Sequence, residues 1–239
     1  MTITRNLDGF SELEASNPLG LLAMANLTKY AYFMDDFLAY EIAQAAGTPY
    51  TFTATNCVDT IVGPTGVLKL VLGGADNDLG QLQLTEAPWQ TNSKRLWFEA
   101  RVKLVLASGG TVAANEIGIG LFSEQTGTGF FAADGLSLTA DDALGFVSFD
   151  ATATANAVMR ENDSQSTETG VVSFVDGAWT TLSVYYDGGI ATFYQDGGQV
   201  AQLTSVDTTS VVTPTLYIKG GEAKANELHC DYILVASER

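Results

Sequence analysis

The stretch from residue 176 to residue 200 constrains the fold of this chain more than any other. It contains two tight-turn signals, Asp187-Gly188-Gly189 and Asp196-Gly197-Gly198, and glycine readily adopts the positive φ angles that hairpin turns need. Before the first turn, one alternating set of side chains is apolar at three positions and the other set is more polar: Leu182, Val184 and Tyr186 against Thr181, Ser183 and Tyr185. This two-residue period predicts a half-buried antiparallel hairpin.

One hairpin is not stable alone, so the rest of the chain must supply further strands. Short alternations separated by glycine-rich turns recur along the chain, and we expect strands at residues 33–38, 50–55, 67–72, 79–85, 95–106, 116–122, 144–150, 157–161, 169–175, 211–219 and 227–236. The strands at 67–72 and 79–85 should pair as a hairpin across the turn between them. This pattern predicts an all-β fold, an antiparallel two-sheet jelly-roll sandwich.

The longest expected strand, residues 95–106, shows the clearest alternation. Its apolar face is formed by Leu96, Phe98, Ala100, Val102, Leu104 and Leu106, and its other face by Trp97, Glu99, Arg101 and Lys103. The second face holds most of a small basic cluster that also includes Lys94 and Arg95. We interpret it as a solvated sheet face, on which Glu99 forms an ion pair with Arg101 or Lys103. In the next strand, Gly118 and Gly120 leave one face bare for a close neighbour or a partner.

We expect residues 1–30 to form an N-terminal arm ahead of a sandwich domain at residues 31–239. Asn17-Pro18 is typical of a helix start, so a short apolar helix is expected after it. Exposed apolar side chains are a liability on a free monomer, which favours packing on the sandwich or on a partner over a frayed terminus. The residues expected to bind a partner are Leu19, Leu21, Leu22, Met24, Leu27, Tyr30, Tyr32 and Phe33.

The chain is strongly acidic, with 28 Asp and Glu against 11 Lys and Arg and a net charge of −17. Nucleic acids and anionic membranes attract clustered Lys and Arg, so we expect neither as a partner. No segment reaches the about 18 apolar residues of a membrane-spanning helix, and the N-terminus lacks a signal-peptide pattern. We therefore expect a soluble, unprocessed protein. Cys57 and Cys230 are expected to be reduced, and a disulfide would require the fold to bring their strands together.

The residue patterns that catalysis requires are incomplete. Retaining sandwich glucanases place three carboxylates as Glu-x-Asp-x-x-Glu, but the nearest match, Glu161-Asn162-Asp163, is followed by Ser166 at the third position. The single histidine, His229, lies beside Cys230 on an expected strand, where adjacent side chains face opposite ways and form no dyad. We therefore expect no enzyme activity and no cofactor.

Two binding alternatives remain open. Clustered acidic turn residues are candidate calcium ligands, although an acidic protein carries such residues in any solvated loop: Asp76-Asn77-Asp78, Asp134, Asp141-Asp142 and Asp150. Carbohydrate binding would need aromatic platforms, and the candidates are Trp89, Trp97, Trp179, Tyr185 and Tyr194. Packing within the sandwich is the favoured interpretation of these aromatic residues.

Several short motifs carry a resemblance to known proteins. The hairpin from Gly177-Ala178-Trp179 to Phe193-Tyr194-Gln195-Asp196-Gly197 is similar to laminin G-like and concanavalin A-like lectin and glucanase sandwiches. Four further motifs look like a group of tailed-phage virion proteins that carry the same sandwich: Asp35-Asp36-Phe37, residues 96–102, Pro214-Thr215-Leu216 and Asp231-Tyr232-Ile233. The likeness covers residues 30–236. It implies a concanavalin A-like fold and a protein that decorates or cements a phage capsid.

These observations predict a non-enzymatic structural protein. It is expected to bind the major capsid protein on the capsid exterior of a virion, using the arm and a sheet edge. Symmetric capsid sites favour a homo-trimer. The alternative is a carbohydrate-binding module of a virion or of a secreted protein, with a glycan as its partner.

Overall fold

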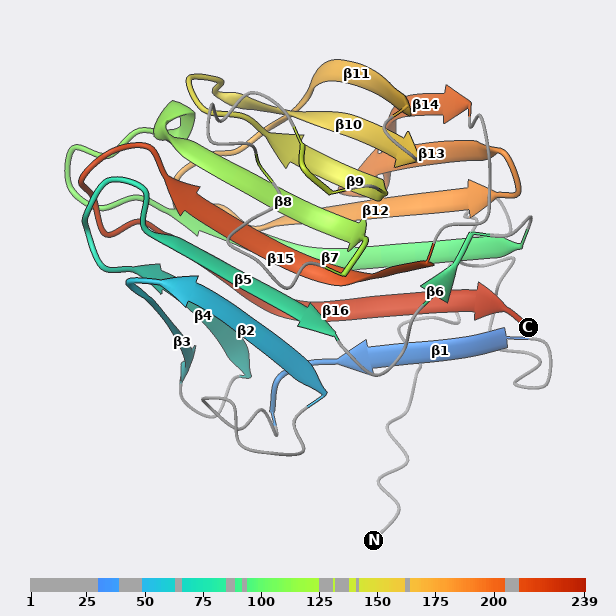
Figure 1. Ribbon diagram of the computed structural model, residues 1–239, viewed down its shortest axis with the longest axis horizontal. Coiled ribbons are helices and arrows are strands. Elements are labelled where there is room, and N and C mark those ends of the chain that lie inside the picture. Colours follow the sequence, from blue (N-terminus) through green and yellow to red (C-terminus); the bar gives the residue numbers. More distant parts are fainter. Residues whose placement is uncertain are drawn as a thin grey trace, which may run out of the picture.

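The computed structural model describes residues 30–38, 49–62, 66–84, 89–91, 94–124, 131, 138–140, 142–161, 164–204 and 211–239. These residues form two antiparallel sheets packed face to face (Figure 1), which confirms the predicted all-β two-sheet sandwich. The described part of the chain also contains a short 3-10 turn, Val112–Ala114. No helix in these ranges has the length and apolarity needed to cross a membrane.

Sheet 1 has the strand order β14-β13-β12-β7-β16-β4-β3. Its long strand β16 pairs with β4 near its start and with β1 along its second half. The bounds are β14 (Gly198–Thr204), β13 (Ile190–Gln195), β12 (Thr180–Asp187), β7 (Arg95–Val105), β16 (Glu227–Glu238), β4 (Val67–Leu72), β3 (Cys57–Val62) and β1 (Tyr30–Asp35). The expected hairpin around residue 188 is therefore confirmed as β12 and β13.

Sheet 2 has the strand order β11-β10-β9-β8-β15-β5-β2, and the short strand β6 pairs with β15. It lies nearer the viewer in Figure 1. The bounds are β11 (Ser164–Ser173), β10 (Thr154–Glu161), β9 (Ala143–Ser148), β8 (Asn115–Phe122), β15 (Val211–Gly220), β5 (Leu79–Leu84), β2 (Tyr50–Thr55) and β6 (Trp89–Gln90). Most of these strands begin and end within a few residues of the positions that the alternation predicts.

The core lies between the sheets and is built from the apolar face of each strand. Leu182, Val184 and Tyr186 of β12 are at most 1% exposed, as their alternation predicts. The two sheets meet at aromatic contacts such as Phe146 of β9 against Phe193 of β13, whose ring centroids are 5.5 Å apart. Burying one such ring contributes about 1.5–3 kcal/mol, so a core of this size stabilises the domain without a disulfide.

The expected hairpin between residues 67–72 and 79–85 is wrong. β4 lies in sheet 1 beside β3, whereas β5 lies in sheet 2 beside β2. The chain crosses between the sheets at Asn56, which has a positive φ of 47°, and returns through residues 73–78. Asn56 Nδ2 donates hydrogen bonds to both carboxylate oxygens of Asp78 at 3.0 Å, so the two crossings are tied together. Alternation predicts that both strands face a core, but it does not tell which sheet holds each strand.

The first strand begins and ends earlier than expected. β1 spans Tyr30–Asp35, and the chain then turns, with Phe37 at a positive φ of 52°. The backbone N–H of Phe37 donates a 2.7 Å hydrogen bond to the Asp35 carboxylate, which is the geometry of an Asx turn. Tyr50 donates to the same carboxylate at 2.8 Å. The turn therefore ends β1 and places the fully buried Phe37 in the core.

The two cysteines are buried free thiols on different strands of sheet 1. Strand β4 lies between them, because Cys57 is opposite Leu72 and Cys230 is opposite Leu68. Two strand spacings amount to about 9.6 Å, which is beyond the reach of a disulfide. Burial, followed by the nearby charges of Asp59 and Asp78, raises the pKa of the Cys57 thiol to about 12. Both thiols therefore serve as small core side chains.

Candidate functional site

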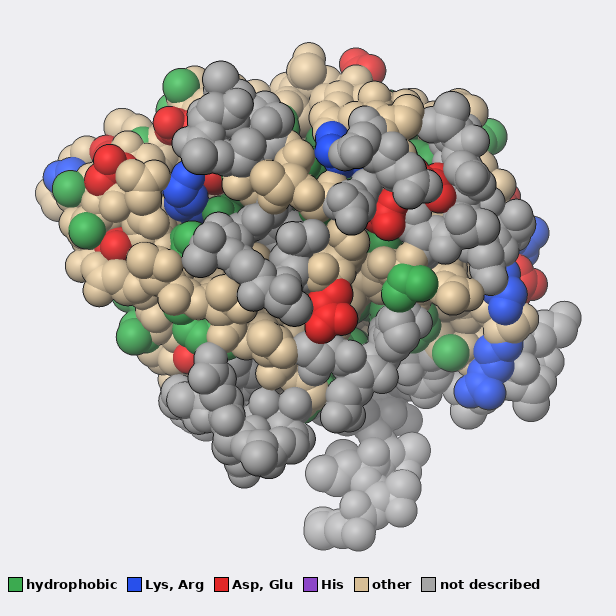
Figure 2. All heavy atoms as spheres, in the orientation of Figure 1, with side chains coloured by type: hydrophobic (Ala, Val, Ile, Leu, Met, Phe, Trp, Pro, Cys, Tyr) green, Lys and Arg blue, Asp and Glu red, His purple; other side chains and the backbone are tan. Residues whose placement is uncertain are grey.

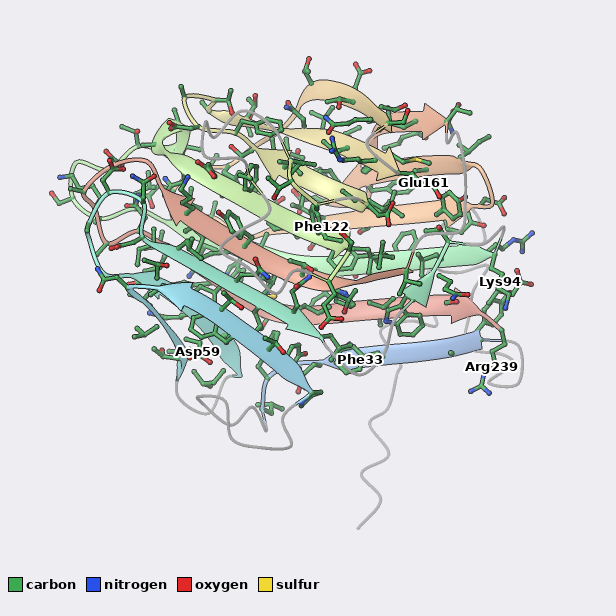
Figure 3. All side chains as sticks on the ribbon, viewed as in Figure 1. Phe33, Asp59, Lys94, Phe122, Glu161 and Arg239 are labelled. Carbon is green, nitrogen blue, oxygen red and sulfur yellow. The ribbon has the colours of Figure 1, made fainter. Side chains whose placement is uncertain are left out.

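The outer face of sheet 2 is closed by an apolar cluster. The cluster consists of Phe122, Phe131, Leu138, Ala140, Ala143, Val147, Val158 and Tyr217. Phe122 projects from the end of β8 (Figure 3). Phe131 and Leu138 form an isolated β-bridge within the same cluster. On the face viewed in Figure 2, the described charged side chains are scattered among uncharged ones.

The glycines of β8 have the close neighbour that their missing side chains predict. A Cβ on Gly120 would lie 2.6 Å from the Cα of Gly145 on β9, and a Cβ on Gly118 would meet the side chain of Tyr217 at 3.3 Å. The bare face is thus filled from within the same chain.

The polar side chains of sheet 2 are also used internally. Gln81 donates to Gln83 at 3.0 Å, Gln83 donates to Thr215 Oγ1 at 3.0 Å, and Thr215 donates to the carbonyl of Thr213 at 3.0 Å. All four residues are at most 5% exposed. Further along this face, Lys219 and Glu116 form an ion pair of 2.8 Å whose side chains are 13% and 3% exposed. This face therefore offers a ligand few accessible polar groups among the described residues.

The outer face of sheet 1 carries an aromatic patch that we define as Tyr30, Trp97, Tyr185, Tyr194 and Tyr232. The antiparallel register sets Trp97 of β7 opposite Tyr185 of β12. The Trp97 ring centroid lies 6.3 Å from that of Tyr185 and 5.9 Å from that of Tyr194. Trp97 is 3% exposed, whereas the four tyrosines are half-buried and keep part of each ring at the surface. Burial raises the pKa of Tyr185 and Tyr194, so both hydroxyls stay protonated.

The indole N–H of Trp97 is an unusual feature of this patch. It is buried and makes no hydrogen bond with any described residue. A buried donor without an acceptor costs about 1–3 kcal/mol. The aromatic patch is therefore not optimised for stability at this position.

Glu99 lies at the centre of the same sheet face. Its carboxylate accepts a 2.7 Å hydrogen bond from Tyr232 and a 3.0 Å hydrogen bond from Ser183. Burial raises the pKa of Glu99, and these two hydrogen bonds only partly oppose the shift. Two hydroxyl groups thus position the carboxylate in a partly buried environment.

The expected ion pair between Glu99 and Arg101 or Lys103 is wrong. Arg101 instead pairs with Asp231 at 2.8 Å. The reason is a β-bulge in β16, where the register shifts between Cys230 and Tyr232. A bulge sets two consecutive residues opposite one, so Asp231 and Tyr232 both reach this face. Alternation from His229 already places Asp231 on this face, whereas without the bulge Tyr232 would have faced the core.

Beyond Glu99 lies a cationic patch, which we define as Lys69, Arg101, Lys103 and His229. The Trp179 ring lies across two of these side chains, with Arg101 Cζ 4.8 Å and Lys103 Nζ 4.6 Å from its centroid. In the strand register, His229 of β16 has Lys103 of β7 on one side and Lys69 of β4 on the other. Three adjacent strands thus bring together side chains from three separate parts of the sequence, at residue 69, residues 101–103 and residue 229.

Glu227 neutralises one side of the cationic patch. Its carboxylate lies 3.1 Å from Lys69 Nζ and 2.6 Å from His229 Nε2. Burial lowers the pKa of His229, although Glu227 opposes this, so the imidazole is neutral at pH 7. Burial acts to raise the pKa of Glu227, but the contacts with His229 and Lys69 outweigh it and the pKa is lowered. His229 and Cys230 face opposite sides of β16, as expected.

The residues that the sequence assigned to partner binding are divided by the structure. Leu19, Leu21, Leu22, Met24 and Leu27 lie outside the described residues. Tyr30 packs on the aromatic patch of sheet 1, and the backbone of Tyr32 pairs with Ala236. Phe33 packs against the core, with its ring 6.4 Å from that of Tyr50. Tyr30 and Phe33 therefore point to opposite faces of β1.

The other sequence candidates are the aromatic residues and the acidic turn residues, of which Asp134 and Asp141 lie outside the described residues. Trp89 is buried in the main core, so only Trp179, Tyr185 and Tyr194 of the aromatic candidates reach the surface. Among the calcium candidates, Asp78 is 3% exposed and accepts hydrogen bonds from Asn56 and from the backbone of Ala75. Within the described ranges, no three acidic, His or Cys side chains cluster as a metal site would require.

The fold and this sheet face define the class of the protein, a concanavalin A-like jelly-roll sandwich. No family model matches the sequence, and no curated protein matches it either. Solved structures do match. A protein of unknown function from Shewanella oneidensis is 16% identical, with a TM-score of 0.58 and 92% of each chain covered. These values show a shared fold.

Two further neighbours differ in their described roles. The carbohydrate recognition domain of Emp47p is 11% identical, with a TM-score of 0.59, over 88% of this chain and 98% of that one. A glycoside hydrolase family protein from Mycobacterium thermorestibile is 12% identical, with a TM-score of 0.56, over 85% of this chain and 99% of that one. The fold is thus common to a binding domain and to a protein of an enzyme family, and fold alone does not decide between them.

Proposed function

We propose that this protein is a carbohydrate-binding domain that holds a glycan on the outer face of sheet 1. The observation that carries the proposal is the presence on one sheet face of half-buried aromatic rings and the hydrogen-bonded carboxylate of Glu99. The rings are Trp179, Tyr185, Tyr194 and Tyr232. Lectin-type neighbours with this fold support it. Carbohydrate binding is also the alternative function that the sequence left open.

The chemistry of the face suits a sugar. One side of a pyranose ring is largely apolar C–H surface and packs on aromatic rings, while its hydroxyl groups need donors and acceptors at the rim. Here the rings come from β12, β13 and β16 and the segment before β12, and the polar groups come from Glu99, Ser183 and Arg101. An extended oligosaccharide fits a face of this form better than a compact ligand does.

We propose binding without cleavage. Hydrolysis by a glycosidase needs two carboxyl groups, about 5–5.5 Å apart for retention or about 6.5–9.5 Å apart for inversion. On this face Glu99 is held by Tyr232 and Ser183, and Asp231 is held by Arg101. A carboxylate engaged with a guanidinium is a poor proton donor and a weakened nucleophile. Release of new reducing ends from any bound oligosaccharide would contradict this part of the proposal.

The test is calorimetric titration of the full chain with a panel of oligosaccharides, followed in parallel by tryptophan fluorescence. Trp179→Ala and Tyr194→Ala should each weaken binding about ten-fold, because each removes a stacking surface. Phe149→Ala is the matched control, since Phe149 is a half-buried aromatic residue that packs with the sheet 2 cluster. Failure of every oligosaccharide to bind, or equal weakening by the control, would overturn the proposal.

Capsid decoration stays a prediction from the sequence, together with the major capsid protein as partner, the homo-trimer and the virion exterior. Co-sedimentation with phage heads that lack the protein tests it separately. Stoichiometric binding of the full chain that is lost on deletion of residues 1–28 would support a capsid role for the arm. Unchanged binding after that deletion would count against the arm as the contact.

A further inference from the structure

Lys103 stands out among the basic residues of sheet 1. The protein carries 28 acidic and 11 basic residues, so an average cation is surrounded by an excess of carboxylates. Arg95 pairs with Asp187, Arg101 with Asp231, and Lys69 with Glu227. Lys103 forms no ion pair with any residue that the structure describes, and its ammonium group contacts the Trp179 ring instead.

The surroundings of Lys103 keep it positive and unpaired. Its neighbour on β16 is the neutral His229, and β4, on the far side of β16, supplies another cation, Lys69. Glu227 is bound to Lys69 and His229, and Asp231 is bound to Arg101. The charges of Lys69, Arg101, Lys103, Glu227 and Asp231 therefore sum to one positive unit in a chain of net charge −17. Glu99 lies on the same face of β7 but four residues from Lys103 and is bonded to Tyr232 and Ser183. A half-buried cation of this kind is the strongest attraction for an anion on this face.

Trp179 contacts this cation and also Arg101, which lies opposite Tyr232 of the aromatic patch in the strand register. Arg101 and Lys103 project from the same side of β7, so the indole ring rests across both side chains. Cation–π contacts of this type hold the ring in place. A sugar packed on Trp179 would therefore bring substituents of its ring to the Lys103 ammonium group.

We infer that this face selects glycans that bear an anionic group, a carboxylate or a sulfate, through Lys103 beside Trp179. The inference rests on the proposed carbohydrate-binding function and names the class of glycan. In the proposed complex, the sugar ring stacks on Trp179 and the anionic group accepts a hydrogen bond from Lys103. Lys69 and Arg101 add attraction at longer range.

The experiment compares three probes that share size but differ in charge. A short oligogalacturonate carries carboxylates, its fully methyl-esterified form is neutral, and a heparin-derived oligosaccharide carries sulfates as well. The anionic probes should bind the full chain about ten-fold more tightly than the neutral ester, because one charge-assisted hydrogen bond is gained. Added salt should reduce this preference.

Variants of β7 locate the preference. Lys103→Met removes the charge but keeps an unbranched apolar stem, and it should abolish the preference for anionic probes. Lys103→Arg should retain it. Arg95→Met is the matched control, because it removes one positive charge from the same face of the same strand at the far end. Thermal unfolding of each variant confirms that it is folded.

The outcomes separate this inference from the function on which it rests. Equal binding of the acidic and esterified probes would overturn the anionic preference and leave carbohydrate binding intact. An anionic preference that survives Lys103→Met would overturn the role of Lys103. Failure of all three probes and of the neutral panel to bind would overturn the proposed function itself.

Discussion

The outer faces of the two sheets arise from the same alternating pattern but differ in how far their side chains are covered and paired. On sheet 2 many outward side chains are buried or hydrogen-bonded within the protein. The apolar ones pack in the Phe122 cluster, and Gln81, Gln83 and Thr215 form a buried series of hydrogen bonds. On sheet 1 the outward tyrosine rings are half-buried, and Lys103 lacks an ion-pair partner among the described residues. The proposed binding face of sheet 1 is therefore distinguished by side chains that folding leaves accessible or without an ion-pair partner, and not by the number of its polar residues.

Removal of one ring from each face would break the comparison most directly. Phe122→Ala should destabilise the protein by about 3–5 kcal/mol, because Phe122 is fully buried and its loss leaves a cavity. Tyr194→Ala on sheet 1 should cost about 1 kcal/mol, because its ring is only half-buried. Urea unfolding of both variants measures the difference. Similar losses at the two positions would mean that both faces serve stability.

Close backbone contact on sheet 2 gives the next effect. A Cβ on Gly145 would lie 2.5 Å from the carbonyl oxygen of Ile119 and 2.8 Å from the Cα of Gly120. Since these are backbone atoms of the paired strand, Gly145→Ala should cost about 1–3 kcal/mol of unfolding free energy. Gly198→Ala is the control, because its added Cβ meets its nearest neighbour at an ordinary 3.4 Å. A loss no larger than that of the control would contradict the tight strand contact.

The smallest expected effect concerns pH and Glu99 on sheet 1. Because burial raises its pKa in the folded state, the folded protein binds more protons than the unfolded chain between the two pKa values. Stability from this group is thus present below the ordinary glutamate pKa of about 4.5 and is lost as pH rises through the folded value. Glu99→Gln should remove this loss, so the stability of the variant relative to the parent should rise as the pH increases across that window.

Denaturant unfolding of both proteins at several pH values checks the Glu99 prediction. The difference between parent and variant cancels most contributions from groups common to both, such as Glu227 and His229. A difference that does not change with pH would show that Glu99 keeps its ordinary pKa in the folded protein.

Much of the strand pattern was predictable because strand alternation is a local property. The faces of β7, the hairpin of β12 and β13, and the opposite orientation of His229 and Cys230 all follow from it. Strand β3 was missed, and β4 and β5 were wrongly paired, because the choice of sheet depends on the crossing at Asn56 rather than on alternation.

The candidate site was less predictable than the strands. The sequence named Trp179, Tyr185 and Tyr194 as aromatic candidates, yet nothing local distinguished them from the buried Trp89 and Trp97. The only signal for the charged part was the basic cluster on β7, which we interpreted as a solvated face. The bulge that brings Tyr232 to the same face as Asp231 was not recognised in the sequence.

The sequence by itself determined the fold class, the positions of most strands and the side chains that face outward, because these depend on periodicity and turn chemistry within a few residues. Only the tertiary structure decided which outward side chains are covered, which cations find a carboxylate and which strands meet. Those outcomes depend on contacts between β4, β7, β12 and β16, whose residues are far apart in the chain. The physical reason is that burial and ion pairing are properties of neighbours in space, and neither can be read from neighbours in sequence.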